Sequence, residues 1–402
     1  MTFKALVVGC GAQGRVISTC LSQSTKVEEI LVADLNVEEC KRYANRIKSS
    51  KLSVYRLDAS NLHDVVSLAK NADVLVNAVT PKFNLTLMDA ALKSDVHYVD
   101  LAFGPPYDTF EKQMNRNDDF KSIHRTALTC TGSSPGIINV LAAHAADDLD
   151  TVKSIRLRIG DVLDSKESIS TWSPETMLGD MAEEPIVFEN GEYKRVPPFS
   201  GRETYDFPLP VGPQPSFMHV HEEALTLPRF IGKGINYLDI KLGTPNMPLI
   251  KSLVELGLCR TDPIDVNGVK VVPRDVLLRL FPPPPTPEEL EKKLEDGTIT
   301  DAHQSYVVEV VGTQKDHTIT YRYVMTPPSL REVQKIMPGA THESFLTGTS
   351  AAIFIEILSE GRIGVSGVIA PECLNRHTRE IVLSRLAQLG VDLQLRTETH
   401  PN

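Results

Sequence analysis

The stretch that decides the fold is Phe3-Lys4-Ala5-Leu6-Val7-Val8-Gly9-Cys10-Gly11-Ala12-Gln13-Gly14, an apolar run that leads directly into a glycine-rich turn. Apolar runs without polar alternation are typical of parallel strands that are buried on both faces. The glycines have the spacing of a dinucleotide-binding turn, and a helical pattern follows them. An acidic residue completes the motif, because Asp34 closes the next apolar run 20 residues beyond Gly14.

Each residue of the turn has a mechanical reason to be there. Gly9 permits the tight turn, Gly11 carries no side chain that would hold a pyrophosphate away, and Gly14 lets the helix pack closely. Ala12 and Gln13 complete the turn, and the helix that follows presents its unpaired N–H groups to the phosphates. We therefore predict that these five residues bind a dinucleotide.

Asp34 sets the expected cofactor preference. A carboxylate at this position accepts hydrogen bonds from both ribose hydroxyls and repels a 2′-phosphate. The residues that follow, Leu35-Asn36-Val37, include no arginine that would hold such a phosphate. The sequence therefore predicts NAD as the cofactor in preference to NADP.

Two further strand ends are expected to contact the cofactor. Asp58 and Ala59 follow the third predicted strand and are placed beside the adenine. Asn77, Ala78 and Val79 follow the fourth and are placed near the nicotinamide ribose. Both predictions use the rule that ligands of an open parallel sheet lie outside the carboxyl ends of its strands.

Strands and helices alternate along the first 130 residues or so. We predict strands at 3–8, 29–33, 53–57, 74–78, 97–101 and 127–131, with helices at 15–22, 37–48, 62–69, 85–93 and 110–125. This alternation is typical of an α/β fold with a Rossmann-type, doubly wound parallel sheet.

The pattern changes after Pro135-Gly136. Alternating strand-like segments and the tight-turn dipeptides Asn190-Gly191 and Asn267-Gly268 indicate a second α+β domain with a largely antiparallel sheet. A proline run at 281–287 is expected to be an extended surface connector, followed by a charged helix at 288–294. An apolar helix at 350–360 is expected to return to the first domain. The predicted domains are therefore 1–132 with 347–402 for the dinucleotide, and 133–346 for substrate binding.

Composition excludes several classes of function. The chain has 402 residues and a net charge of −10, without a dense run of Lys and Arg, so nucleic acid is not an expected partner. No segment reaches the roughly 18 to 20 apolar residues that span a bilayer, and no signal peptide is recognisable. The six cysteines are scattered without Cys-x-x-Cys spacing, so we expect neither a metal site nor disulfides. These features favour a soluble, cytoplasmic protein.

Several motifs beyond the glycine turn resemble the saccharopine dehydrogenase-like family, and within it the lysine 6-dehydrogenases. They are Asn77-Ala78-Val79-Thr80-Pro81, Tyr98-Val99-Asp100-Leu101, Pro135-Gly136-Ile137-Ile138-Asn139, Ser173-Pro174-Glu175, Asp265-Val266-Asn267-Gly268, Pro273-Arg274-Asp275-Val276-Leu277-Leu278 and Thr347-Gly348-Thr349-Ser350-Ala351-Ala352. The resemblance implies a homodimeric two-domain dehydrogenase that oxidises a carbon–nitrogen bond of an amino acid or amino-acid adduct. Two segments, 130–134 and 219–223, depart from the family pattern near the expected substrate position, so lysine itself is not assigned.

Three residues are candidates for proton transfer during amine oxidation. Asp100 closes a strand on the cofactor side and is either a base, an ammonium anchor or a cap. His219 and His221 lie two residues apart, so on a strand they would share one face. Histidine titrates near neutral pH, which suits a proton shuttle, and the alternative is an ordinary polar loop. A metal site is less favoured because a third ligand at suitable spacing is missing.

Three other residues are candidates for substrate contact. Arg229 would bind a substrate carboxylate through a bidentate contact, and Arg274 is the alternative. Cys130 ends a strand near the cofactor and is either a nucleophile or a buried apolar thiol. Trp172 is the only tryptophan and is expected either to line the pocket or to pack in the core.

Four hypotheses of function stay open at this point. The first is an NAD-dependent amino-acid dehydrogenase, and the second is a reductase that joins an amine to a keto acid or aldehyde. The third is a dinucleotide-binding regulator without turnover. A hydroxyl-oxidising enzyme is the fourth, because fold alone does not decide the chemistry.

Overall fold

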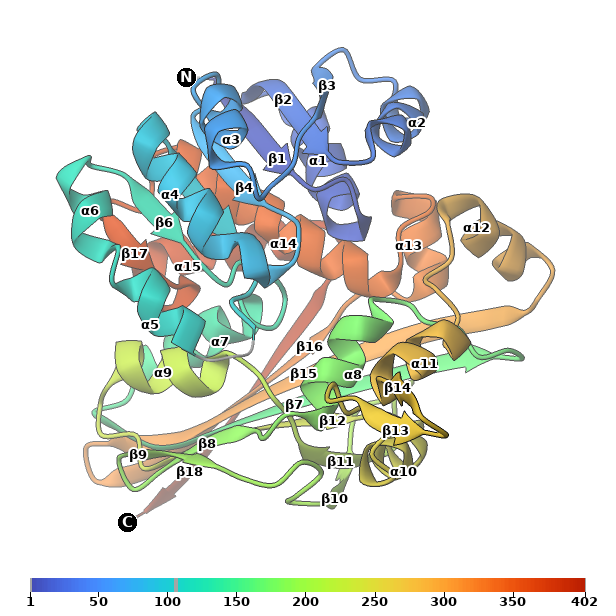
Figure 1. Ribbon diagram of the computed structural model, residues 1–402. Coiled ribbons are helices and arrows are strands. Elements are labelled where there is room, and N and C mark those ends of the chain that lie inside the picture. The colour runs from blue at the N-terminus through green and yellow to red at the C-terminus, as the bar shows by residue number, and fades with distance from the viewer. Residues whose placement is uncertain (1, 105–107, 402) are drawn as a thin grey trace. The chain divides into compact units, whose positions relative to one another are not determined.

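Two units make up the computed structural model, which describes residues 2–104 and 108–401 (Figure 1). Unit 1 comprises Met1–His144 and Ser344–Leu389, and unit 2 comprises Ala145–Glu343 and Gly390–Asn402. In the described part of the chain, no helix is long and apolar enough to cross a membrane.

Unit 1 contains a parallel sheet of seven strands within the described residues, in the order β17-β6-β5-β4-β1-β2-β3. Its strands are β1 (Phe3–Val8), β2 (Val27–Asp34), β3 (Leu52–Arg56), β4 (Val74–Asn77), β5 (His97–Asp100), β6 (Thr126–Leu128) and β17 (Gly367–Ile369). The strand order reverses between β1 and β4, which is the topological switch point where such sheets bind ligands. The predicted doubly wound parallel sheet is therefore confirmed.

Helices alternate with these strands. They are α1 (Ala12–Gln23), α2 (Val37–Ile47), α3 (Leu62–Ala69), α4 (Asn84–Ser94), α5 (Asp108–Met114), α6 (Asn117–Ser122), α7 (Ile137–Asp147), α14 (His342–Ser359) and α15 (Arg376–Gln388). The single helix predicted at 110–125 was wrong, because the chain breaks it between Met114 and Asn117. The Asn117 side chain instead accepts a hydrogen bond from the Val368 N–H on β17, at 3.1 Å. β17 itself was not predicted, since it has three residues and pairs with a strand far away in the sequence.

Unit 2 is built on a nine-stranded sheet, counted over the described residues. Its main path is β10-β11-β12-β7-β15-β16-β18, and β8 and β9 join beside β12. The strands are β7 (Thr151–Ser165), β8 (Ile186–Glu189), β9 (Glu192–Arg195), β10 (Glu203–Asp206), β11 (Pro213–Met218), β12 (Tyr237–Gly243), β15 (Ile299–Gln314), β16 (His317–Thr326) and β18 (Asp392–Pro401). Only the β12–β7 pair is parallel among these neighbours, so the sheet is largely antiparallel, as predicted.

The remaining elements of unit 2 are a small hairpin and six helices among the described residues. They are β13 (Ile264–Val266), β14 (Val269–Val271), α8 (Pro174–Ala182), α9 (Glu223–Ile231), α10 (Met247–Glu255), α11 (Pro273–Leu280), α12 (Pro287–Glu295) and α13 (Leu330–Ile336). Both predicted tight turns form, because Asn190-Gly191 and Asn267-Gly268 have positive φ at both positions and connect paired strands. The charged helix after the proline run is α12.

The C-terminal segment does not follow the predicted division. Residues 347–402 were assigned as a whole to the dinucleotide domain, but Gly390–Asn402 belongs to unit 2. The reason is β18, which pairs along its whole length with β16, from Asp392 opposite Thr326 to Pro401 opposite His317. Sequence periodicity cannot choose between distant pairing partners, so the division was wrong for these residues.

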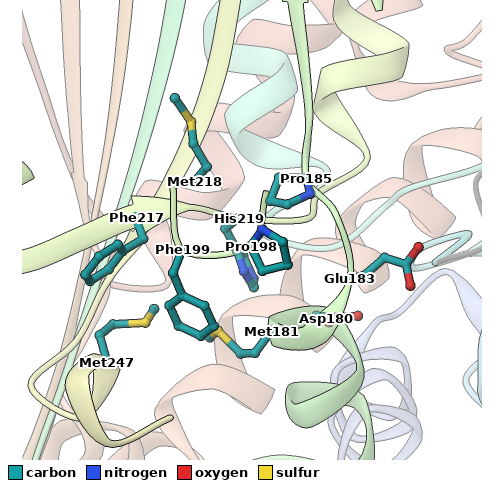
Figure 2. Close-up of a pocket in the computed structure, with 10 residues that line it drawn as sticks. All are labelled: Asp180, Met181, Glu183, Pro185, Pro198, Phe199, Phe217, Met218, His219 and Met247. Atoms are coloured by element: carbon teal, nitrogen blue, oxygen red, sulfur yellow. The ribbon is translucent and has the colours of Figure 1, made fainter. Parts of the chain in front are cut away.

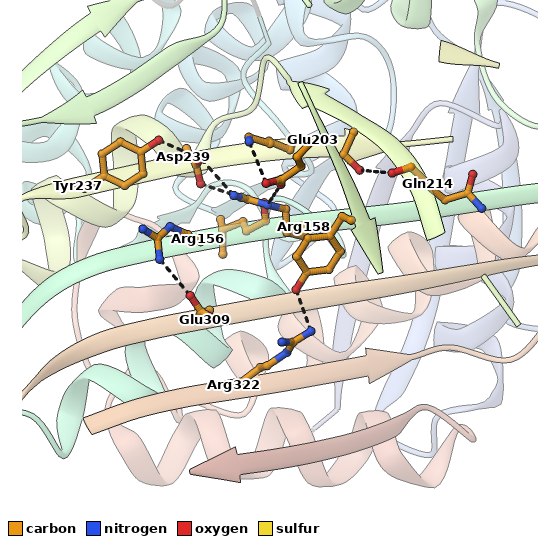
Figure 3. Close-up of polar contacts among 12 residues, drawn as sticks. Arg156, Arg158, Glu203, Gln214, Tyr237, Asp239, Glu309 and Arg322 are labelled. Carbon is orange, nitrogen blue, oxygen red and sulfur yellow. Dashed lines mark hydrogen bonds and ion pairs between the residues drawn. The ribbon is translucent and has the colours of Figure 1, made fainter. Parts of the chain in front are cut away.

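A buried ion network ties three strands of unit 2 together (Figure 3). Arg158 on β7 donates to both carboxylate oxygens of Asp239, at 2.7 and 3.2 Å, and to Glu203, at 2.6 Å. Tyr237 donates to the same Asp239, and Lys241 pairs with Glu203. The Arg158 side chain is only 5% exposed, so its charge depends on these partners.

We expect Arg158→Met to destabilise unit 2 by about 3 kcal/mol, because it leaves the buried Asp239 carboxylate without its main cation. Arg156→Met is the matched control on the same strand, since its side chain is 46% exposed and pairs only with Glu309 in the ion network drawn. That control should change stability by about 1 kcal/mol or less. Thermal and urea denaturation measure both, and equal effects of the two substitutions would contradict the prediction.

Candidate functional site

The glycine turn has the geometry that a dinucleotide requires. Gly9 has a φ of +111°, and a Cβ there would lie 2.6 Å from the Ala78 carbonyl oxygen. A Cβ on Gly14 would lie 1.9 Å from the Gly9 carbonyl oxygen, so the helix can pack this closely only with glycine. At Gly11, by contrast, a Cβ would meet nothing within 4 Å. The fold itself requires glycine at positions 9 and 14, whereas Gly11 leaves space for another molecule.

The start of α1 is ready to receive phosphate groups. No side chain caps the helix at Gly11, so its first N–H groups are directed toward that space. The side-chain oxygen Oε1 of Gln13 is buried and makes no hydrogen bond, but as an acceptor it is not a partner for phosphate oxygens. Open space and uncapped N–H groups together fit a bound pyrophosphate.

Asp34 ends β2 beside this turn. One of its carboxylate oxygens accepts the N–H of Cys10, at 2.8 Å, and the other accepts the N–H of Asn36, at 2.9 Å. Sequence reasoning considered only the residues after Asp34 and missed Arg15 in the first turn of α1. The Arg15 guanidinium donates to the Cys10 carbonyl oxygen and pairs with Glu39 at 2.5 Å. A cation therefore does lie beside the turn, already paired with a carboxylate.

The other predicted cofactor residues form supporting turns. The Asp58 carboxylate accepts the N–H and hydroxyl of Ser60, so it closes a turn at the end of β3, next to the buried Ala59. The Asn77 amide is buried, accepts the Val79 N–H at 3.0 Å and donates to Asn84 at 2.7 Å. These contacts shape the loops at the strand ends, and contact with the cofactor stays a prediction for them.

Asp100 and Cys130 lie together at the ends of β5 and β6. Asp100 is 1% exposed. One carboxylate oxygen accepts the Cys130 N–H at 2.9 Å and the other accepts Nε2 of Gln113 at 2.7 Å. Cys130 is fully buried, with a φ of +61°. These contacts hold the ends of β5 and β6 together. A role of Asp100 as a base stays a prediction. Contact of the Cys130 thiol with substrate also stays a prediction.

The two predicted histidines meet in unit 2. His219 and His221 follow β11 in a loop rather than on a strand, and their ring centroids are 5.5 Å apart. Nδ1 of His221 lies 2.7 Å from a carboxylate oxygen of Glu223, whose side chain is fully buried in the first turn of α9. Glu222 lies 3.6 Å from the same nitrogen. The structure thus adds two carboxylates that the histidine spacing alone did not predict as partners.

The surroundings of the two histidines shift their pKa values in opposite directions. Burial, followed by the charge of His221, lowers the pKa of His219 to about 3. Burial also lowers the pKa of His221, but the Glu223 carboxylate, with Glu222 and Asp180, outweighs it and raises this pKa to about 9. Neighbouring groups whose environments separate their pKa values in this way are typical of acid–base pairs.

A pocket opens beside His219 (Figure 2). Its walls are mostly apolar, and Asp180, Glu183 and His219 supply the charged or titratable groups among the residues that line it in Figure 2. Burial, followed by the charge of Glu222, raises the pKa of Asp180 to about 7. The apolar lining consists of Met181, Pro185, Pro198, Phe199, Phe217, Met218 and Met247. The lining is of the kind found in small-molecule sites, but the volume of about 210 Å³ is below the roughly 300 to 1,000 Å³ of such sites.

The predicted substrate residues Arg229 and Trp172 are not among the residues that line this pocket. Arg229 is exposed in the last turn of α9. Its alternative, Arg274, donates to the Cys259 carbonyl oxygen at 2.8 Å, which is a structural contact. Trp172 is partly buried in the loop before α8. Substrate contact by Arg229 or Trp172 stays a prediction.

A second cluster of titratable groups in unit 2 was not predicted. Asp161 on β7 meets His342 and Glu343, the first two residues of α14, which belong to unit 2, and their ligand atoms lie within 4.8 Å of one another. These residues are about 180 positions apart in the sequence, so only the pairing of the chain brings them together.

Two family models cover most of the chain. Residues 5–128 match the saccharopine dehydrogenase NADP-binding domain, and residues 132–391 match the saccharopine dehydrogenase C-terminal domain. The chain belongs to the saccharopine dehydrogenase family. The predicted family is therefore confirmed, and with it an oxidoreductase of this type with a nicotinamide cofactor.

Relatives within the saccharopine dehydrogenase family carry more specific names. A carboxyaminopropylagmatine dehydrogenase of Synechocystis is 27% identical over 96% of both chains. A carboxynorspermidine synthase of Vibrio cholerae is 27% identical over 69% of this chain and 72% of its own. The solved apo saccharopine dehydrogenase (L-Glu forming) of Saccharomyces cerevisiae has a TM-score of 0.71 at 16% identity, covering 98% of this chain and 100% of its own, which shows a shared fold.

Proposed function

We propose that the protein joins a primary amine of the polyamine class to a carbonyl compound that carries a carboxylate, by reductive condensation. The amine and the carbonyl group lose water to form an imine. A hydride from the reduced nicotinamide and a proton then convert the imine to a secondary amine. The bound dinucleotide supplies the hydride. Of the hypotheses drawn from the sequence, this is the reductase that joins an amine to a keto acid or aldehyde.

The observation that carries the proposal is the His219–His221 pair. Imine formation needs an acid that protonates the departing hydroxyl group of the amine–carbonyl adduct. His221, held protonated by Glu223, supplies that proton from Nε2, on the ring edge opposite Glu223. His219 stays neutral beside it and accepts a hydrogen bond rather than repelling an ammonium group. The names of two relatives, a synthase and a dehydrogenase of carboxylated polyamines, support this class of reaction.

NAD is the proposed cofactor. Asp34 presents a carboxylate where the adenosine ribose is expected, and that carboxylate repels a 2′-phosphate. Arg15, the nearby cation, is paired with Glu39, so holding such a phosphate would require breaking that contact. NADH should therefore support turnover at lower concentration than NADPH.

The decisive experiment follows oxidation of NADH, and separately of NADPH, with the purified protein. Diamines and agmatine are combined with aldehydes and 2-oxo acids that carry a carboxylate, and each substrate is also tested alone. The expected result is oxidation only when both substrates are present, with a product mass equal to amine plus carbonyl compound, minus water, plus two hydrogens. Reduction of NAD by an amino acid without any carbonyl compound would instead identify an oxidative deaminase. Dinucleotide binding without turnover would favour a regulator.

A further inference from the structure

The cluster of Asp161, His342 and Glu343 is short of hydrogen-bond partners. His342 is 1% exposed, and its Nδ1 makes no hydrogen bond. Its Nε2 is directed at Asp161, 3.5 Å from a carboxylate oxygen. Oε2 of Glu343 is also buried without a partner. Buried polar atoms are nearly always satisfied in proteins, so unsatisfied ones on neighbouring side chains point to a ligand.

The groups around the cluster include both donors and acceptors. Asp161 accepts a hydrogen bond from Gln304 at 2.7 Å, and Thr171 bonds to Glu343. Asp301 adds a third carboxylate in the electrostatic surroundings of His342, with His303 3.6 Å from it. Arg331 donates its main-chain N–H to Asp301, and its guanidinium is directed at the main-chain carbonyl oxygens of residues 294, 299 and 300.

The surroundings of the cluster raise the pKa values of two of its groups. Burial, followed by the charge of Asp161, raises the pKa of Glu343 to about 7. Burial lowers the pKa of His342, but the contact with Asp161 outweighs it, so this pKa is raised. A bound cation would release a proton from Glu343 by stabilising its charged form.

We propose that this cluster binds the distal ammonium group of the amine substrate, an assignment that rests on the proposed function. An alkylammonium group has three N–H donors, and the carboxylates of Asp161 and Glu343 offer it acceptor oxygens and compensating negative charge. The site therefore selects a diamine, whose second amino group is charged, over a monoamine of the same length.

The test compares the binding of putrescine with that of n-butylamine, which has the same carbon chain and lacks the second amino group. 1,3-Diaminopropane with n-propylamine, and cadaverine with n-pentylamine, extend the comparison to other lengths. Titrations are followed by calorimetry and by the fluorescence of Trp172, the only tryptophan, which is adjacent to Thr171. The wild-type protein should bind at least one diamine about 10-fold more tightly than its matched monoamine, because a hydrogen-bonded charge is added.

Asp161→Asn and Glu343→Gln should remove this preference for the diamine. Asp164→Asn is the matched control, because Asp164 lies on the same strand with an exposed side chain, and it should keep the preference. Calorimetry at pH 7 in two buffers of different ionisation enthalpy should show that the diamine releases protons from the wild-type protein. Glu343→Gln should lose that release, which a merely structural role of Glu343 would not change.

The outcomes separate this site from the proposed reaction. A diamine preference that both variants lose, without any condensation activity in the wild-type protein, would uphold the site and overturn the reaction. Condensation activity with an unchanged diamine preference in both variants would overturn the site and uphold the reaction. If the variants fail to fold, the wild-type comparison decides, because equal binding of all diamines and monoamines overturns the site. A stoichiometric divalent metal in the purified protein that is absent from Asp161→Asn would also overturn it.

Discussion

Gly11→Ala is expected to weaken binding of the nicotinamide dinucleotide by about 100-fold while leaving the melting temperature of the protein unchanged. The added Cβ meets no protein atom within 4 Å, and the backbone of Gly11 is extended, with φ −73° and ψ −166°. Alanine therefore fits the protein itself. The methyl group would occupy the space in front of the uncapped start of α1, where the pyrophosphate must approach to reach the N–H groups. Fluorescence titration with NADH and NADPH measures the affinity, and a thermal scan measures stability.

Gly14→Ala is the contrasting variant for this prediction. Its Cβ would lie 1.9 Å from the Gly9 carbonyl oxygen, so it should lower the melting temperature as well as the affinity. The pair separates loss of a ligand contact from loss of structure. Wild-type affinity in a folded Gly11→Ala protein would show that the phosphates do not bind at this turn.

His221→Gln is expected to lower kcat about 100- to 1000-fold, because the proposed general acid is lost. The acid is the protonated imidazole, so activity of the wild-type protein should be full below the pKa of about 9 and fall as pH rises through it. Glu223→Gln removes the carboxylate that raises this pKa, and the fall should then begin at lower pH. Steady-state kinetics over a series of pH values, with the condensation substrates, measure both effects.

His317→Gln is the control for this substitution, since His317 is exposed at the start of β16. It should leave both the rate and the pH profile as in the wild-type protein. If activity of folded Glu223→Gln protein falls over the same pH range as that of the wild-type protein, the fall reflects the titration of a group other than His221. Full activity of His221→Gln would remove His221 from the mechanism.

The first third of the fold could be predicted from the sequence because its signals are local. The apolar run 3–8, the glycine spacing and the position of Asp34 lie within a few tens of residues, and each constrains the backbone directly. The same holds for the Asn190-Gly191 and Asn267-Gly268 hairpins, where the residue types favour positive φ. The broken helix at Met114–Asn117 was missed because residue 117 bonds to β17, a distant strand.

In the candidate sites, too, some residues could be predicted from the sequence, whereas their partners became visible only in the structure. His219 and His221 stood out in the sequence by their spacing, but the carboxylates that set their charge states became visible only with the start of α9 and with Asp180 of α8 in place. Arg15 was missed beside Asp34 because a helix turn, rather than sequence adjacency, brings it there.

By itself, then, the sequence determined the dinucleotide turn, the parallel sheet around it and the family of the protein, since these depend on contiguous residue patterns. Only the tertiary structure decided the course of β18 and the meeting of Asp161 with His342 and Glu343. Both depend on which distant strands pair, and pairing is decided by burial and hydrogen bonding across the whole sheet rather than by any local stretch.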